Sequence, residues 1–395
     1  MLARLPAILL LACAADAQTP AVRFRFDLGS GKVAGYDDKL GYGFEQPSGE
    51  AAPIYFSVRV PEEGNYRVTV TLGDSQAASV TTVKVELRRL MLERVETQAG
   101  KFETRTFLVN VRTPRIPGGD GVILKDREKS FEAWAWDDRL TLEFAGARPA
   151  VSAIEIEKAD SVPTIYIAGD STSTDQPREP FNSWGQMLTR FFKPEIAIAN
   201  HGESGESLHG FIMENRLAKL MSVIRPGDFL LIQMGHNDQK EKGEGVGAFT
   251  TYKANLKQFV ALAREHGATP ILVTPMNRLT FAPDGTITNS LGEYPEAVRQ
   301  VAHEESVALI DLNAMSKTLY EALGPENAHV AFAGKDHTHH SDYGSYELAK
   351  CIAEAIKRDR LPLARYLFER PPFDPAHPDP PAEFDVPAEP YPAAR

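Results

Sequence analysis

The sequence predicts an all-β sandwich followed by an α/β region built on a parallel sheet. Between residues 22 and 158, apolar and polar residues alternate with a period of two, and Gly, Pro, Asp and Asn separate the runs. From residue 164 onward, short apolar runs alternate with stretches of helical periodicity. That alternation is typical of parallel strands whose connecting helices cover both faces of the sheet. A length of 395 residues accommodates both parts.

Residues 1–17 are expected to be a signal peptide. Arg4 supplies a positive charge, an apolar run too short to span a membrane follows, and Ala15-Asp16-Ala17 matches a small-residue cleavage pattern. An alternative interpretation is a lipoprotein signal, in which Cys13 becomes the lipidated N-terminal residue. Both interpretations predict export, so the protein is expected to be secreted or periplasmic, with a lipid anchor at the cell surface as the variant.

Charge and cysteine content exclude several classes of protein. A net charge of −11 without a basic cluster argues against a nucleic-acid surface. The same charge repels a polyanionic substrate at long range, so local basic residues would have to hold one. Apart from Cys13 the only cysteine is Cys351, so no internal disulfide framework is expected.

The first part of the chain, residues 22–158, reads as many short strands without a long helix, which indicates a sandwich or jelly roll. The expected strands are 23–27, 54–60, 66–72, 83–87, 104–111 and 139–144. The stretch from Phe26 to Gly31, with Gly35-Tyr36, resembles the opening of galactose-binding-like jelly rolls attached to polysaccharide-degrading enzymes. Aromatic residues that could stack on sugars, or fill the core as is more usual, are Tyr36, Tyr42, Trp134 and Trp136.

The second part is expected to span residues 164–365, after a linker at 159–163. The expected strands are 164–168, 195–199, 228–234, 270–274 and 308–311. The expected helices are 183–192, 207–221, 250–266, 293–305, 312–323 and 341–358. Residues 370–395 hold nine prolines and predict an extended strap or a disordered tail.

Four polar blocks interrupt this pattern at element boundaries. They are Gly169-Asp170-Ser171, residues 200–205, residues 235–238 and residues 336–339. The first three blocks follow predicted parallel strands, and carboxyl ends of such strands share one rim of the sheet. The fourth block precedes the last helix, so we expect all four to meet at that rim.

The residue types in these blocks are those that acyl transfer requires. The Ser171 hydroxyl becomes a nucleophile when an imidazole takes its proton, and a carboxylate must orient that imidazole. Asp336 and His339 are three residues apart, which lets them meet in a turn or helix. The backbone N–H groups of Ser171 and Gly205 and the Asn237 amide could stabilise the oxyanion.

The four blocks, in this order, resemble those of the SGNH (GDSL-type) hydrolases and cover most of residues 164–358. The residues of these blocks resemble most those of the rhamnogalacturonan acetylesterase branch: Ala-Gly-Asp-Ser-Thr-Ser-Thr, Asn-x-Gly-x-Ser-Gly-x-Ser, Gly-His-Asn-Asp and Asp-x-Thr-His. The resemblance implies a three-layer α/β/α flavodoxin-like fold. By the same resemblance Ser171 is the nucleophile and Asp336 and His339 are its partners, while Gly205 and Asn237 join the Ser171 N–H in the oxyanion hole.

The expected activity is that of a secreted serine esterase that removes acetyl groups from pectic rhamnogalacturonan through an acyl-enzyme, without a cofactor. The expected partner is therefore an acetylated polysaccharide or oligosaccharide. Alternatives are acetylated xylan, another acetylated sugar or a short-chain lipid ester. A non-catalytic carbohydrate-binding protein is the alternative from another class. The sequence indicates no oligomeric state.

Two further residues are candidates for contact with the substrate. Trp184 lies in the first helix after the nucleophile, where it either packs in the core or lines the acyl pocket. Arg278 follows the fourth strand on the same rim, where it either clamps a galacturonate carboxylate or has a structural role. A metal site is a further alternative, although it would leave the Ser, Gly and Asn blocks unexplained. Its ligands would be Asp336, His337, His339 and His340.

Overall fold

The computed structural model describes residues 22–29, 33–45 and 53–388. The expected signal peptide and Cys13 lie outside the described residues, as do residues 389–395 at the end of the proline-rich tail. None of the helices in the described ranges is both long and apolar enough to cross a membrane.

Two antiparallel sheets form the N-terminal β region, which confirms the predicted all-β character. The first sheet has the strand order β1 (Arg23–Asp27), β9 (Val151–Lys158), β4 (Gly64–Leu72), β7 (Glu103–Val111). The order in the second is β2 (Tyr42–Glu45), β3 (Ile54–Arg59), β8 (Arg139–Arg148), β5 (Ser79–Val85), β6 (Arg89–Thr97). Apolar side chains of both sheets share one core, for example Val68 and Phe56. The finer expectation of a galactose-binding-like jelly roll stays a prediction.

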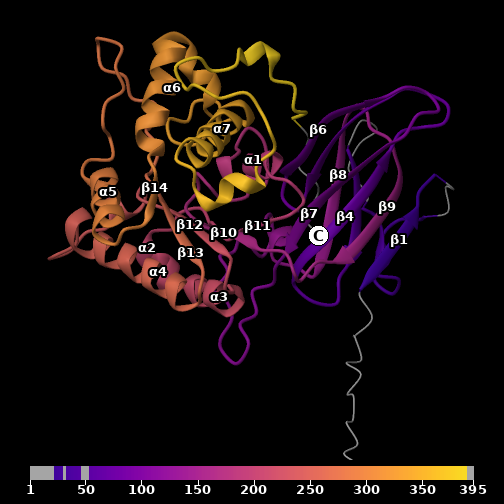
Figure 1. Ribbon diagram of the computed structural model, residues 1–395, viewed down its shortest axis with the longest axis horizontal. Helices are drawn as coiled ribbons and strands as arrows, with labels where there is room; N and C mark the ends of the chain where they lie inside the picture. The colour runs from indigo at the N-terminus through magenta and orange to yellow at the C-terminus, as the bar shows by residue number, and fades with distance from the viewer. Residues whose placement is uncertain (1–21, 30–32, 46–52, 389–395) are drawn as a thin grey trace, which may run out of the picture.

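A five-stranded parallel sheet forms the centre of the α/β region (Figure 1). Its order is β11 (Ala197–Asn200), β10 (Thr164–Gly169), β12 (Phe229–Gln233), β13 (Thr269–Val273), β14 (Ala308–Ile310). These are the five strands that the sequence predicts, and each pair is parallel. Parallel strands buried on both faces read as continuous apolar runs, which is why their positions were predictable.

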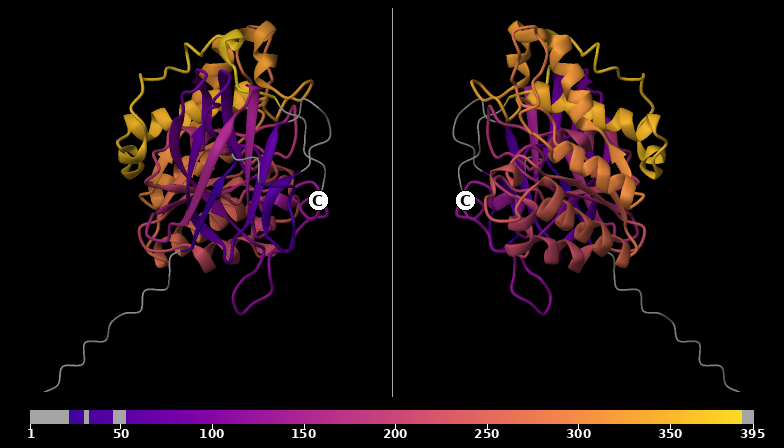
Figure 2. Two further views of the ribbon diagram at one scale, coloured as in Figure 1. Left: turned by 90° about the vertical axis from the view of Figure 1, so that its right-hand side faces the viewer. Right: turned by 90° about the vertical axis from the view of Figure 1, so that its left-hand side faces the viewer.

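Helices cover both faces of this sheet. One core joins the sheet to α1 (Trp184–Leu188), α6 (Leu312–Asn327) and α7 (Asp342–Arg358). A second core joins the opposite face to α2 (Leu208–Met213), α3 (Arg216–Val223), α4 (Lys253–Glu265) and α5 (Tyr294–Glu304). The result is the three-layer arrangement that the alternation of strands and helices predicts. Figure 2 shows the N-terminal strands on one side of the molecule and these helices on the other.

Two segments tie the β region to the α/β region. Residues 112–138, here called the crossing segment, leave β7 and return in β8. On the way their Glu128 side chain binds Arg216 of α3, with distances of 2.9 and 2.6 Å. The tail, residues 370–388, contacts both regions: Tyr343 of α7 donates to its Asp379 carbonyl at 2.7 Å, and Lys84 of β5 donates to its Pro387 carbonyl at 2.6 Å.

Candidate active site

A tight turn after β10 presents Ser171 at the carboxyl rim of the sheet. The Asp170 carboxylate accepts hydrogen bonds from the Thr172 N–H at 2.9 Å and from the Thr172 hydroxyl at 2.7 Å. The Ser173 N–H donates to the Asp170 carbonyl at 3.0 Å, which closes the turn. A Cβ at Gly169 would lie 1.9 Å from the Ser173 hydroxyl oxygen, so this close approach requires glycine.

Ser171, His339 and Asp336 form one continuous hydrogen-bonded row. The His339 Nε2 atom lies 2.9 Å from the Ser171 Oγ atom, and the His339 Nδ1 atom lies 2.9 Å from an Asp336 carboxylate oxygen. The other Asp336 oxygen accepts the backbone N–H groups of Thr338 at 2.6 Å and His339 at 2.9 Å. This is the arrangement in which an imidazole can take a proton from a serine hydroxyl while a carboxylate fixes its orientation.

The Asp336 carboxyl is held in its ionised form. Partial burial acts to raise its pKa, but the hydrogen bonds from the His339 ring and from the His339 and Thr338 N–H groups outweigh this effect. The pKa of Asp336 therefore lies below its usual value. An ionised carboxylate at this position can stabilise the imidazolium that forms when His339 accepts a proton.

The neighbouring histidines point to different partners. His337 is exposed, and its Nδ1 atom lies 3.3 Å from the Leu279 carbonyl oxygen. His340 is fully buried, with Nε2 2.7 Å from the Tyr320 hydroxyl, and burial lowers its pKa to about 3. The three rings therefore do not converge on one point, so the alternative metal site at this cluster is not assembled.

The loops that carry Gly205 and Asn237 lie next to each other on the same rim. The Asn237 Nδ2 atom donates to the Glu206 carbonyl oxygen at 2.9 Å, which joins the third block to the second. Gly205 has a φ of +84°, a left-handed conformation that favours glycine. Within the described ranges, the N–H groups of Ser171 and Gly205 have no hydrogen-bond acceptor. Two backbone donors are thus available for a developing oxyanion, while the roles of these residues remain predictions.

Three buried carboxyl groups lie beside the second block. Among the residues that the structure describes, Glu128, Glu132 and Glu203 form the one group of three possible metal-ligating side chains, with ligand atoms within 4.8 Å of one another. Burial is the largest cause that raises the pKa of Glu203, and the nearby carboxyls of Glu132 and Glu128 raise it further. Arg216 binds both oxygens of Glu128, and Arg127 Nε donates to Glu203 at 2.6 Å. These guanidinium groups already supply positive charge, and we assign no metal here.

Of the two roles left open for Trp184, the structure shows core packing and no exposed surface for contact with a substrate. The Trp184 side chain is fully buried in the core beneath the sheet, and its indole N–H donates to the Gln233 side-chain oxygen at 2.9 Å. Arg278 does lie beside the site. It is half-buried, its Nε donates to the Thr338 hydroxyl at 3.2 Å, and its Nη2 donates to the His236 carbonyl at 3.3 Å.

Further contacts around the reacting groups were not predicted. The Phe181 ring packs edge-on against the His339 ring, with centroids 5.8 Å apart. The Gln176 side-chain amide donates to the Ser171 carbonyl at 2.7 Å. His236 Nδ1 lies 3.3 Å from the Asp170 carboxylate, which braces the turn before the serine. Of these three residues, His236 alone had a signal in the sequence, because it is a polar residue of the third block.

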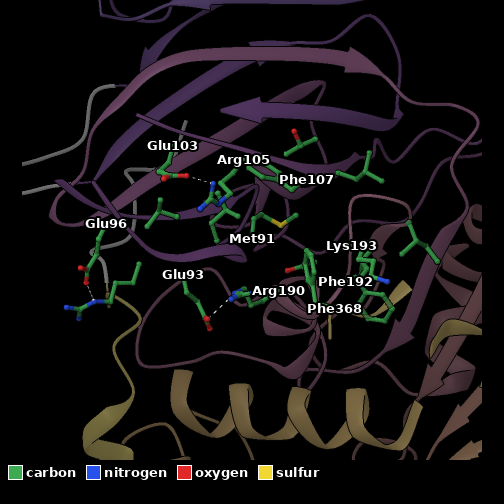
Figure 3. Close-up of a pocket in the computed structure, with 18 residues that line it drawn as sticks. Met91, Glu93, Glu96, Glu103, Arg105, Phe107, Arg190, Phe192, Lys193 and Phe368 are labelled. Atoms are coloured by element: carbon green, nitrogen blue, oxygen red, sulfur yellow. Dashed lines mark hydrogen bonds and ion pairs between the residues drawn. The ribbon is translucent and has the colours of Figure 1, made fainter. Parts of the chain in front are cut away.

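A separate hollow of about 420 Å³ opens between β6, β7 and the short 3₁₀ helix η2 (Thr189–Phe191), as Figure 3 shows. None of the four blocks contributes to its lining. Three ion pairs border it: Glu93–Arg190 at 3.0 Å, Arg94–Glu96 at 2.8 Å and Glu103–Arg105 at 2.6 Å. Because these charges are compensated locally, the hollow identifies no class of ligand.

Comparisons with known proteins agree with this arrangement. Residues 167–345 match the model of the GDSL-like lipase/acylhydrolase family. The rhamnogalacturonan acetylesterase RhgT of Bacillus subtilis (strain 168) is 39% identical over 221 residues, which cover 52% of this chain and 94% of that protein. The uncharacterized esterase YxiM of the same organism is 28% identical over 385 residues, or 86% of this chain and 91% of its own. A crystal structure of the YxiM protein covers 86% of this chain and 99% of its own chain, with 24% identity and a TM-score of 0.51, and shows a shared fold.

Proposed function

Because this chain belongs to the GDSL-like lipase/acylhydrolase family and is a carboxylic ester hydrolase, we propose that it removes acetyl groups from rhamnogalacturonan as a serine esterase. The observation that carries the proposal is the 2.9 Å contact between the Ser171 hydroxyl and the His339 ring. Support for the substrate comes from RhgT and from a second relative, a probable rhamnogalacturonan acetylesterase of Bacillus subtilis (strain 168), each 39% identical over 52% of this chain.

The proposed reaction has two halves. In the first, Ser171 Oγ attacks the acetyl carbonyl carbon while His339 Nε2 takes the hydroxyl proton and Asp336 stabilises the imidazolium. The oxyanion of the tetrahedral intermediate accepts hydrogen bonds from the Ser171 and Gly205 N–H groups and from the Asn237 amide. The intermediate collapses, and the sugar oxygen leaves with the proton from His339.

In the second half, water replaces the sugar. His339 takes a proton from a water molecule, whose oxygen attacks the acetyl carbon bound to Ser171. The new tetrahedral intermediate collapses to acetic acid, which ionises to acetate, and Ser171 recovers its proton from the ring. Apart from the substrate and this water molecule, the steps use only groups of the chain, so the proposal includes no cofactor.

The substrate proposal also uses the charge around the site. The protein carries a net charge of −11, so an acidic glycan such as rhamnogalacturonan has to be held by nearby cations. Arg278 is one cation that borders the fourth block, through its 3.2 Å contact with Thr338. Its Nη1 and Nη2 atoms donate to the Ser290 and His236 carbonyl oxygens at 3.4 and 3.3 Å. We propose that the guanidinium attracts a substrate carboxylate through its charge while these contacts hold it in place. We also propose export, on the basis of residues 1–17 alone, with a lipid anchor at Cys13 as the variant.

Acetate release from a panel of acetylated glycans tests this proposal. The panel contains acetylated rhamnogalacturonan, acetylated xylan and acetylated mannan at equal acetyl concentration, with wild type and Ser171→Ala compared on each. We expect the highest kcat/KM on rhamnogalacturonan and no release by Ser171→Ala. A higher kcat/KM on xylan or mannan would transfer the assignment to that glycan. Glycan binding without acetate release would favour the carbohydrate-binding alternative, which the esterase assignment already disfavours.

A further inference from the structure

We propose that Lys125 and Arg127, two cations of the N-terminal β region, are positioning residues that orient the Gly205 N–H toward the oxyanion. The inference rests on the proposed function, because it takes Gly205 as an oxyanion donor. It assigns a role in the esterase reaction to residues outside the part of the chain that carries the four blocks.

Both cations bind one carbonyl oxygen. Lys125 Nζ donates to the Ser204 carbonyl at 3.0 Å, and an Arg127 Nη2 hydrogen bond reaches the same oxygen. They also flank the next residue: a Cβ placed on Gly205 would lie 3.7 Å from Lys125 Nζ and 3.8 Å from Arg127 Nη2, with no other atom within 4 Å. The Ser204–Gly205 peptide is therefore held from the side of the crossing segment.

Because the peptide bond is planar, the hydrogen bonds that hold the Ser204 carbonyl also set the direction of the Gly205 N–H. The Ser204 C=O and the Gly205 N–H belong to one planar unit and point in opposite directions. Fixing the oxygen with two cationic donors therefore fixes the direction of the N–H. Hydrogen bonds to the carbonyl also polarise the peptide, which makes its N–H a stronger donor. The left-handed φ of Gly205 is otherwise a conformation that glycine leaves readily.

The same cations hold the loop through its acidic side chains. Arg127 Nε donates to the Glu203 carboxyl at 2.6 Å, and Lys125 Nζ forms an ion pair with Glu206. The backbone carbonyl of Glu206 in turn accepts the Asn237 amide at 2.9 Å. Both proposed oxyanion donors beyond the serine thus depend on one loop, which Lys125 and Arg127 clamp.

The crossing segment is anchored firmly enough to act as a fixed support. Glu128 and Arg216 form a buried, two-bond ion pair, and the Ile123 N–H donates to the Glu214 carbonyl at 3.0 Å. The Trp136 ring meets the His201 ring of the second block edge-on, with centroids 5.9 Å apart. Lys125 and Arg127 lie between these anchors. Because acidic partners already occupy both cations, a role in clamping a substrate carboxylate is less favoured than positioning.

The test measures kcat and KM separately with a small neutral aryl acetate, so that glycan binding does not contribute. The variants are Lys125→Gln, Arg127→Gln and the conservative Arg127→Lys, and the matched control is Lys129→Gln. Lys129 lies on the same segment, is exposed, and pairs with exposed Asp126 at 3.7 Å. We expect each Gln variant to lower kcat by roughly tenfold or more with KM within about twofold, partial recovery in Arg127→Lys, and no change in Lys129→Gln.

A second measurement separates positioning from loss of folding. A small alkyl boronic acid forms a tetrahedral anionic adduct with an active serine, so its inhibition constant should rise in step with the fall in kcat. Thermal melting identifies any unfolded variant. If Arg127→Gln does not fold, the comparison of Lys125→Gln and Arg127→Lys with wild type still tests the positioning role. Folded Gln variants with wild-type kcat and wild-type boronate affinity would overturn this inference. Wild-type activity in Ser171→Ala would instead overturn the proposed function.

Discussion

The Nε2 atom of His340 lies 2.7 Å from the Tyr320 hydroxyl inside the core, although His340 directly follows the histidine that faces Ser171. His339 closes the bend that begins at Asp336, with its N–H on the Asp336 carboxylate, whereas His340 forms backbone bridges with Asn182 and Phe332. His339 therefore reaches the rim of the sheet while His340 enters the core. One dipeptide supplies both a candidate catalytic base and a structural histidine.

His340 should make the protein less stable in acid. Burial, followed by the charges of His339 and His236, lowers its pKa to about 3, whereas an unfolded histidine titrates near its usual value of about 6.5. Between these values the unfolded state binds more protons than the folded state, so the free energy of unfolding falls as the pH falls. In urea unfolding from pH 6.5 to pH 4, wild type should lose about 1.4 kcal/mol per pH unit more than His340→Asn.

The control for this prediction is His303→Asn, because His303 is exposed at the end of α5. Its pH dependence should equal that of wild type. Parallel stability curves for wild type and His340→Asn would show that the buried ring gains no proton on unfolding in this range.

The adjacent histidines allow a matched test of the proposed general base. His339→Ala should lower kcat for an aryl acetate by about 10³-fold or more, because it removes the Nε2 atom that lies 2.9 Å from the Ser171 hydroxyl. His337→Ala should retain wild-type kcat, since its ring is exposed and meets the Leu279 carbonyl. Equal losses in both variants would point to disruption of the loop rather than to proton transfer.

Asn237→Ala should remove one proposed oxyanion donor. The expected effect is a fall in kcat of about 10²–10³-fold with little change in KM, since the donor acts on the charge that develops in the transition state. Lys242→Ala is the control, because Lys242 is an exposed residue of the loop that follows Asn237. A rise in KM at constant kcat in Asn237→Ala would assign the amide to ground-state binding instead.

Trp184→Phe should affect stability rather than substrate affinity. The substitution leaves a small cavity in the core and removes the 2.9 Å hydrogen bond to Gln233, so the free energy of unfolding should fall by about 1–3 kcal/mol. KM for acetylated glycan should equal the wild-type value, because the indole has no exposed surface. A variant with unchanged stability and a raised KM would restore Trp184 to the substrate pocket.

The periodicity of apolar residues predicted the order of strands and helices in the α/β region. It did not predict where the backbone departs from regular geometry. The expected helix at 207–221 is two helices in the structure, because Asn215 adopts a left-handed φ of +61°. Asparagine tolerates that conformation, and no change in periodicity marks it. Strand β6 was missed because its pairing with β5 shifts register and Arg94 has a φ of +39°, which disturbs the period of two.

In the candidate site, the sequence indicated the residues in short polar blocks but not the residues that contact those blocks from distant parts of the chain. Ser171, Asp336 and His339 were predictable because each sits in a short block at an element boundary. Lys125 and Arg127 were not, because the loop that they bind is nearly 80 residues further along the chain. An ion pair at such a separation leaves no local periodicity, and charged residues on a loop read as solvent-exposed.

The rate of acetate release from an aryl acetate by wild type and by Ser171→Ala tests the central claim most directly. The Ser171 hydroxyl is the proposed nucleophile, and alanine has nothing to replace it. We expect the folded variant to lose at least about 10⁴-fold in kcat, and mass spectrometry of rapidly quenched wild type to find the acetyl group on Ser171. Equal rates for wild type and a folded Ser171→Ala variant would contradict the account.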